Sequence, residues 1–216
     1  MVDLPLSDIL VYLLTGARWT LLLSAIAFLG GGIGALFLLL LRYGWPRFGG
    51  RFLRLYVEPF QGTPALMQLF LVSFGLPKLG IDVSPLVAAS IALTLYASAF
   101  LAEIWRGCVD AIPRGQWDAS GALGLNFLNQ MRDVILPQAL RIAVPPTVGF
   151  LTQLVKTTAI ASIVGFVELT KSGQIVSNAT FQPLLVYGIV AMMYFAMCYP
   201  LTVCARLLER KLAQSR

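Results

Sequence analysis

Apolar residues occupy most of the chain in long runs, which short polar or basic segments separate. The first run, residues 19–41, holds about 23 mostly apolar residues, enough to cross a hydrocarbon core of about 30 Å at 1.5 Å per residue. Similar runs follow at 55–76, 86–102, 140–166 and 183–208. The pattern predicts an all-α integral membrane protein with five transmembrane helices, forming a single domain over residues 1–216.

Basic residues mark the same side of the membrane at each place where they gather. They follow the first run and close the chain, as Arg42, Arg47, Arg51 and Arg54, and as Arg206, Arg210, Lys211 and Arg216. The positive-inside rule places such clusters in the cytoplasm. We therefore expect the N-terminus outside (periplasmic), the C-terminus inside, and the long polar loop at 103–137 in the cytoplasm.

Composition supports a membrane protein and excludes several kinds of chemistry. Hydrophobic residues make up 58% of the chain and charged residues 12%, with a mean hydropathy of +0.80, whereas about 25% charged is usual in soluble domains. The net charge of +6 lies at the ends of apolar runs rather than on a basic face, so we expect no nucleic-acid partner. The chain has no histidine and no Gly-x-x-x-x-Gly-Lys segment, so we expect no enzyme activity, no metal site and no ATP site of its own.

The polar loop predicts two short helices with a glycine between them. Residues 116–123 favour a helix that ends at Gly124, because glycine adopts the left-handed conformation of a C-terminal cap. Asn126 can cap a second helix that extends to about Val134. The first helix carries small side chains, which let another backbone approach closely: Ala119, Ser120, Gly121 and Ala122.

This loop resembles the signature loop of inner-membrane permease subunits of ATP-binding-cassette (ABC) importers. That signature is Glu-Ala-Ala, three residues, Gly, nine residues and Ile-x-Leu-Pro. Here the corresponding segments are Asp118-Ala119-Ser120, Gly124 and Val134-Ile135-Leu136-Pro137. The segments 60–70, 155–158 and 167–169 resemble the polar amino acid subfamily, although Gln61 stands where that subfamily usually has Arg.

The resemblance implies a type I importer permease fold whose coupling loop covers about residues 106–139. The implied coupling residues are Asp118, Ala119, Ser120, Gly121, Ala122, Leu123, Gly124 and Pro137. It further implies two ABC ATPase subunits, which bind ATP and Mg and hydrolyse the ATP, so that this chain binds no cofactor. The other implied partners are a second permease subunit (a copy or a homologue), a periplasmic or lipid-anchored substrate-binding protein, membrane lipid and an amino acid substrate. The implied location is the bacterial inner membrane, which the chain crosses several times.

Polar residues inside or near the apolar runs are candidates for the translocation path: Glu58, Gln68, Glu103, Gln153, Lys156 and Thr157. A lysine at a helix centre costs about 2.5–3.5 kcal/mol on insertion scales, so Lys156 either lines the path or has a structural role. For Glu58 and Glu103 an ion pair with a nearby arginine is the favoured interpretation. The acidic residue that often follows this lysine in the subfamily is replaced here by Thr157.

Two other classes of function fit a multi-pass membrane chain. An ion-gradient-driven secondary transporter would need repeated halves or an acidic residue at the middle of a span, and neither is found in the sequence. A structural subunit that only scaffolds a complex is the other alternative. The sequence leaves open which amino acid or derivative is carried, and whether the permease pair is homodimeric or heterodimeric.

Overall fold

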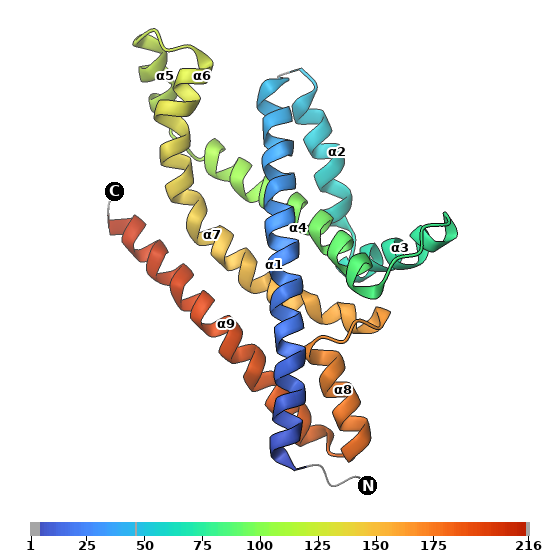
Figure 1. Cartoon of the computed structure of the whole chain (residues 1–216). Helices are drawn as coiled ribbons and strands as arrows, with labels where there is room; N and C mark the ends of the chain where they lie inside the picture. Colours follow the sequence, from blue (N-terminus) through green and yellow to red (C-terminus); the bar gives the residue numbers. More distant parts are fainter. Residues whose placement is uncertain (1–4, 46, 215–216) are drawn as a thin grey trace.

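The computed structural model describes residues 5–45 and 47–214, and in these residues helices are joined by short turns (Figure 1). The helices are α1 (Leu6–Gly44), α2 (Gly49–Gly62), α3 (Ala65–Lys78), α4 (Pro85–Asp110), α5 (Arg114–Ala122), α6 (Phe127–Asn129), α7 (Leu136–Thr157), α8 (Leu169–Thr180) and α9 (Pro183–Gln214). A π-helical turn, η1 (Gln130–Ile135), joins α6 to α7, and a 3-10 helix, η2 (Thr158–Val164), follows α7. The all-α prediction is confirmed for the described residues.

Four continuous helical segments in the described residues have the length and apolar character of membrane spans: Leu6–Gly44, Pro85–Asp110, Phe127–Val164 and Pro183–Leu212. The second expected span, 55–76, is not one helix. It breaks at Thr63, whose φ of −121° and ψ of 146° are extended, because Pro64 disfavours a helical conformation in the residue before it and has no N–H to donate. The helices on either side, α2 and α3, run in different directions (Figure 1).

Two other segments differ from the sequence-based expectation. Helix α1 begins at Leu6, so it extends well before the apolar run at 19–41 and includes the exposed Arg18. The segment 168–182, expected as an external connection, contains helix α8. Both additions pack together, because Ile9 and Leu13 in the added part of α1 contact the cluster formed with α8 and α9.

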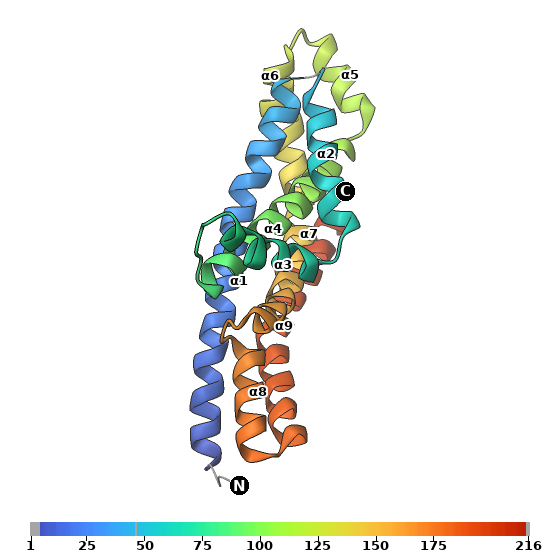
Figure 2. The same ribbon diagram turned by 90° about the vertical axis from the view of Figure 1, so that its right-hand side faces the viewer.

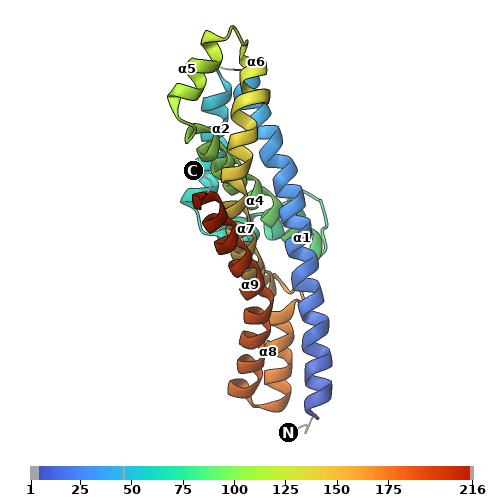
Figure 3. The same cartoon turned by 90° about the vertical axis from the view of Figure 1, so that its left-hand side faces the viewer.

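Helix α1 runs almost the full length of the molecule. We call residues 114–135 the knob; it comprises α5, α6 and η1 and lies at one end, whereas α8 and the beginning of α1 lie at the other (Figures 1, 2 and 3). The N-terminal half of α9 lies beside α8, and the two pack together with α1. The molecule therefore has two distant ends that one helix connects.

Small residues allow α1 and α4 to approach closely. A Cβ atom at Gly31 would lie 2.5 Å from the Cβ of Ala97, and one at Gly34 would lie 2.8 Å from the Cβ of Ser98. Contacts of this kind let helices associate in lipid, where no hydrophobic effect drives them together. Gly31 and Gly34 of α1 therefore serve to pack this helix against α4.

Three apolar clusters hold the helices together. The largest joins α1, α2, α3, α4 and α7 around residues such as Leu23, Leu93 and Leu154. The second joins α1, α8 and α9, and the third lies where the knob meets the bundle. The knob is consequently a packed part of the structure.

Candidate functional site

A Schellman motif ends the first helix of the knob. Gly124 has a φ of +76°, its N–H donates to the carbonyl of Gly121, and the N–H of Leu125 donates to the carbonyl of Ser120. These bonds satisfy carbonyl groups that have no partner within the helix. The predicted left-handed glycine cap is confirmed.

Asn126 begins the second half of the knob. Its side-chain oxygen accepts a hydrogen bond of 2.9 Å from the N–H of Asn129, which confirms the predicted cap. The expected end near Val134 is wrong, because the helix passes through the π turn and continues into α7. Pro137 stands in the first turn of α7 and has no N–H to donate, although a regular helix would use a donor at this position. The π turn just before it has a wider hydrogen-bonding pattern, which accommodates the missing donor.

Gln130 closes the knob on itself. Its side-chain amide donates to the carbonyl of Leu125 at 3.0 Å, and a Cβ atom at Gly121 would lie 3.3 Å from the same nitrogen. Ser120 is buried, with 3% of its surface exposed, and its hydroxyl donates to the carbonyl of Trp117. Only part of the small-residue face is therefore available to a partner.

The surface of the knob is more apolar than the small residues alone suggested. Leu123 is 81% exposed and Leu128 is 74% exposed, while Phe127 is about half exposed and stacks on Trp117. The sequence analysis included Leu123 in the coupling set but overlooked Leu128 and Phe127. Their signal was two large apolar residues directly after a helix cap, in a loop that is otherwise polar.

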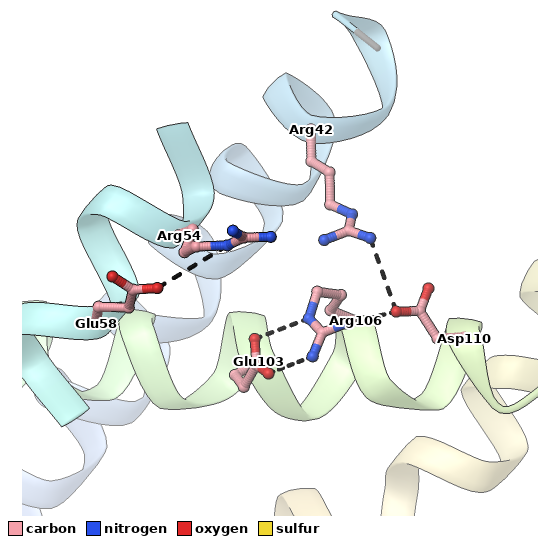
Figure 4. A network of polar contacts seen from close by, with 6 residues as sticks. All are labelled: Arg42, Arg54, Glu58, Glu103, Arg106 and Asp110. Carbon is pink, nitrogen blue, oxygen red and sulfur yellow. Dashed lines mark hydrogen bonds and ion pairs between the residues drawn. The ribbon is translucent and has the colours of Figure 1, made fainter. Parts of the chain in front are cut away.

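The expected ion pairs of Glu58 and Glu103 are both present in a charged cavity at the knob end of the bundle (Figure 4). Arg106 donates through Nε to Glu103 at 2.8 Å and through Nη1 to Asp110 at 2.5 Å, while Arg54 lies 3.9 Å from Glu58. The cavity has a volume of about 710 Å³, and α1, α2 and α4 supply most of its wall. Three arginines and two carboxylates line this cavity: Arg42, Arg54, Arg106, Glu58 and Glu103.

Gln68 lies apart from this cavity and stabilises the break between α2 and α3. Its side-chain nitrogen donates to the carbonyls of Phe60 and Thr63 and to the Thr63 hydroxyl, at 2.9–3.1 Å. Gln68 is only 8% exposed. In this subunit its side-chain amide therefore has a structural role.

Gln153, Lys156 and Thr157 come together near the end of α7. Their spacing places them on one face of the helix, where Gln153 and Lys156 are exposed and Thr157 is half-buried. The Thr157 hydroxyl donates to the carbonyl of Gln153. Within the described part of the chain, Lys156 has no ion-pair partner, so its charge is available to a ligand or to another chain.

Glu168 is a fully buried carboxylate that the sequence analysis did not single out. One oxygen accepts from the N–H of Lys171, and the other accepts from the N–H of Thr170 and the Tyr194 hydroxyl, all at 2.9 Å. The hydroxyl of Thr20 on α1 lies 3.3 Å from the second oxygen. Burial raises the pKa of Glu168, although these four donors oppose the shift. The carboxylate thus caps α8 and joins it to α1 and α9.

Comparison with known proteins identifies the class to which this fold and loop belong. Residues 30–214 match the family described as binding-protein-dependent transport system inner membrane component, and the chain belongs to this family. It is 34% identical to a probable amino-acid ABC transporter permease protein, YckA, of Bacillus subtilis (strain 168), over 94% of this chain and 89% of the relative. It is 32% identical to the L-cystine transport system permease protein TcyB of the same organism, over 91% and 85%.

The fold agrees with that of a solved transporter. A crystal structure described as an amino acid ABC transporter with histidines has a TM-score of 0.90 and 31% sequence identity, over 98% of this chain and 100% of that chain. The protein is therefore a membrane permease subunit with the type I ABC importer fold. The resemblance noted in the polar loop is confirmed, and the family supports neither a secondary transporter nor a mere scaffold.

Proposed function

We propose that this chain forms one half of a two-subunit pore that imports polar amino acids or closely related compounds across the bacterial inner membrane. Two ABC ATPase subunits bind ATP and Mg on the cytoplasmic side, and an extracytoplasmic binding protein delivers the substrate. The substrate class rests on the names of the relatives, which include permeases for amino acids and for cystine. The second permease subunit is a copy of this chain or a homologue.

The observation that carries the proposal is the knob. It projects from the end of the bundle that the arginine cluster places in the cytoplasm, and it presents Leu123 and Leu128 to solvent. Exposed large apolar side chains on a compact, internally bonded element are suited to insertion into a groove of a partner. In this proposal each ATPase holds one knob, and ATP-driven approach of the ATPases moves the two knobs together.

Substitution of Gly124 tests the coupling role. No atom lies within 4 Å of a Cβ placed there, so Gly124→Val introduces only the backbone strain of a left-handed valine, and we expect uptake to fall by about tenfold. Gly124→Asn tolerates this conformation and should keep most of the uptake. Gly115→Ala, also in open space but within a helix, controls for loss of a glycine.

The measurement is uptake by vesicles that contain the permease, its ATPase and its binding protein, normalised to the amount of assembled complex. Normal uptake by Gly124→Val at the wild-type level of complex would exclude the knob as the coupling element.

A further inference from the structure

Two neighbouring residues at the end of α1 attach this helix to residues 110–112, which lead from α4 into the knob and which we call the knob base. Nη2 of Arg42 lies 3.7 Å from Oδ2 of Asp110, the last residue of α4 before the chain enters the knob (Figure 4). Tyr43 packs against the third apolar cluster, which includes Ile112, Met131 and Ile135. One residue therefore contacts the knob base by charge and the next by apolar packing.

The ion pair is part of a network that holds Asp110 in place. Arg106 donates to the same oxygen of Asp110 and is itself held by both oxygens of Glu103 (Figure 4). The side chains of Arg42 and Arg106 are only 26% and 28% exposed. Partial burial reduces screening by solvent, and a shared carboxylate lowers the entropy lost for each pair, so this network is stronger than an isolated surface ion pair.

Other contacts restrict the same end of α1. Gly49, which begins α2, lies so close to Leu41 and Arg42 that a Cβ atom there would collide with their backbone. Around Gly31 and Gly34, α1 packs closely on α4, and in the first half of α1 Thr20 contacts the Glu168 carboxylate. A displacement of the knob base at Asp110 would thus act directly on a helix that extends to α8.

We infer that Arg42 and Tyr43 are positioning residues that make the end of α1 and the knob one rigid unit, so that movement of the knob is delivered to α1. The inference rests on the proposed function, because it assumes that ATPase subunits move the knob. It goes beyond that function by assigning a mechanical link outside the signature loop. Neither residue belongs to the set of coupling residues that the loop motif implies.

Distances between spin labels test whether the unit is rigid. With the native cysteines replaced, labels at the exposed positions Gly44 and Gln116 report on the end of α1 and the knob. A second pair, at Gln116 and at the exposed Leu79 after α3, reports on the knob and a helix that lies beyond the break at Thr63. Distances within one subunit are measured in the complete complex, without nucleotide and with ATP held by a hydrolysis-deficient ATPase. A partner permease without cysteines stays free of labels and keeps each measurement within a single chain.

We expect the distance from Gly44 to Gln116 to stay constant while the distance from Gln116 to Leu79 changes, because the break at Thr63 lets α3 move relative to α1. Equal changes in both distances would overturn the rigid link but leave the proposed function intact. No change in either distance would mean that the knob does not move relative to the rest of its own subunit, which overturns the inference that Arg42 and Tyr43 deliver such a movement to α1, while the coupling role itself is tested by Gly124→Val.

Variants of Arg42 separate a positioning role from a folding role. Arg42→Gln removes the charge and should lower the amount of substrate transported per ATP hydrolysed by a factor of roughly two to five, the range for a partly exposed ion pair. Arg42→Lys should restore much of this ratio. Arg51→Gln is the matched control, since Arg51 belongs to the same basic cluster but is exposed on α2. Equal transport per ATP in Arg42→Gln and Arg51→Gln, at equal amounts of complex, would refute the assignment of Arg42.

Discussion

Removal of the Glu168 carboxylate should loosen the end of the molecule opposite the knob. Glu168→Ala deletes the cap of α8, worth about 1 kcal/mol, and leaves the Tyr194 hydroxyl and two backbone N–H groups without this acceptor. An unsatisfied buried donor costs about 1–3 kcal/mol, but the Tyr194 hydroxyl keeps a contact of 3.0 Å with the Thr170 hydroxyl. We therefore expect a total loss of about 3 kcal/mol.

Thermal unfolding of the purified complex in detergent measures this loss. About 3 kcal/mol corresponds to a fall in Tm of roughly 6–12 °C for a chain of this size. Glu168→Gln keeps one acceptor oxygen and should lie between Glu168→Ala and the wild type. Glu58→Gln is the control, because Glu58 is exposed and its ion pair at 3.9 Å contributes little. A Glu168→Ala variant as stable as Glu58→Gln would show that the buried network contributes no stability.

The raised pKa of Glu168 predicts how the stability of the folded protein changes with pH. Burial raises the pKa of Glu168 in the folded protein, so folding takes up a proton at pH values between the ordinary pKa of 4.5 and the raised one. The contribution of Glu168 to stability therefore falls as the pH rises through this window. Glu168→Gln does not titrate and should remove this part of the pH dependence, which melting curves at several pH values would detect.

Two further predictions concern the path and the topology. Lys156→Met deletes the charge and keeps an apolar side chain of similar length. If Lys156 lines the path, the apparent affinity or the selectivity among acidic, neutral and basic amino acids should change at equal amounts of complex. Unchanged selectivity would show that Lys156 does not line the path, whatever the substitution does to assembly. A cysteine at Gly50, where a Cβ has open space, should react only with reagents that reach the cytoplasm, and one at the exposed Asn178 only with external reagents. Labelling from the opposite sides, with the native cysteines replaced, would reverse the proposed orientation.

Features set by nearest neighbours in the chain could be predicted from the sequence. The hydrogen bonds of the left-handed cap at Gly124 and of the side-chain cap at Asn126 join residues three to five positions apart, so local chemistry determines both caps. The apolar runs likewise indicated helices of spanning length. Pro64 could have indicated the break at Thr63, because a proline disfavours a helical conformation in the residue before it. The prediction missed the break because the apolar run continues through it, and hydropathy carries no information on the backbone conformation.

Features that depend on distant partners could not be predicted. Glu168 obtains two of its donors from Thr20 and Tyr194, which lie 148 and 26 residues away, and a carboxylate in a polar segment gives no sign of burial. The ion pair between Arg42 and Asp110 could not be predicted for the same reason, since one residue lies near the end of α1 and the other is the last residue of α4. Only the packing of α1 on α4 brings Arg42 and Asp110 together.

The position of prolines explains why α1 is suited to connect the two ends. Prolines occur inside α2, α3, α7 and α9, where each removes a helical hydrogen bond and allows a bend, whereas α1 has none and α4 has one only at its first turn. These two long helices are also the pair that close glycine contacts hold together. Thr20, in the first half of α1, and Arg42, near its C-terminal end, stand about 33 Å apart at 1.5 Å per residue, and each joins a polar network. A load applied to the knob is therefore carried along α1 with little bending, while the surrounding helices contain the positions at which the bundle can flex.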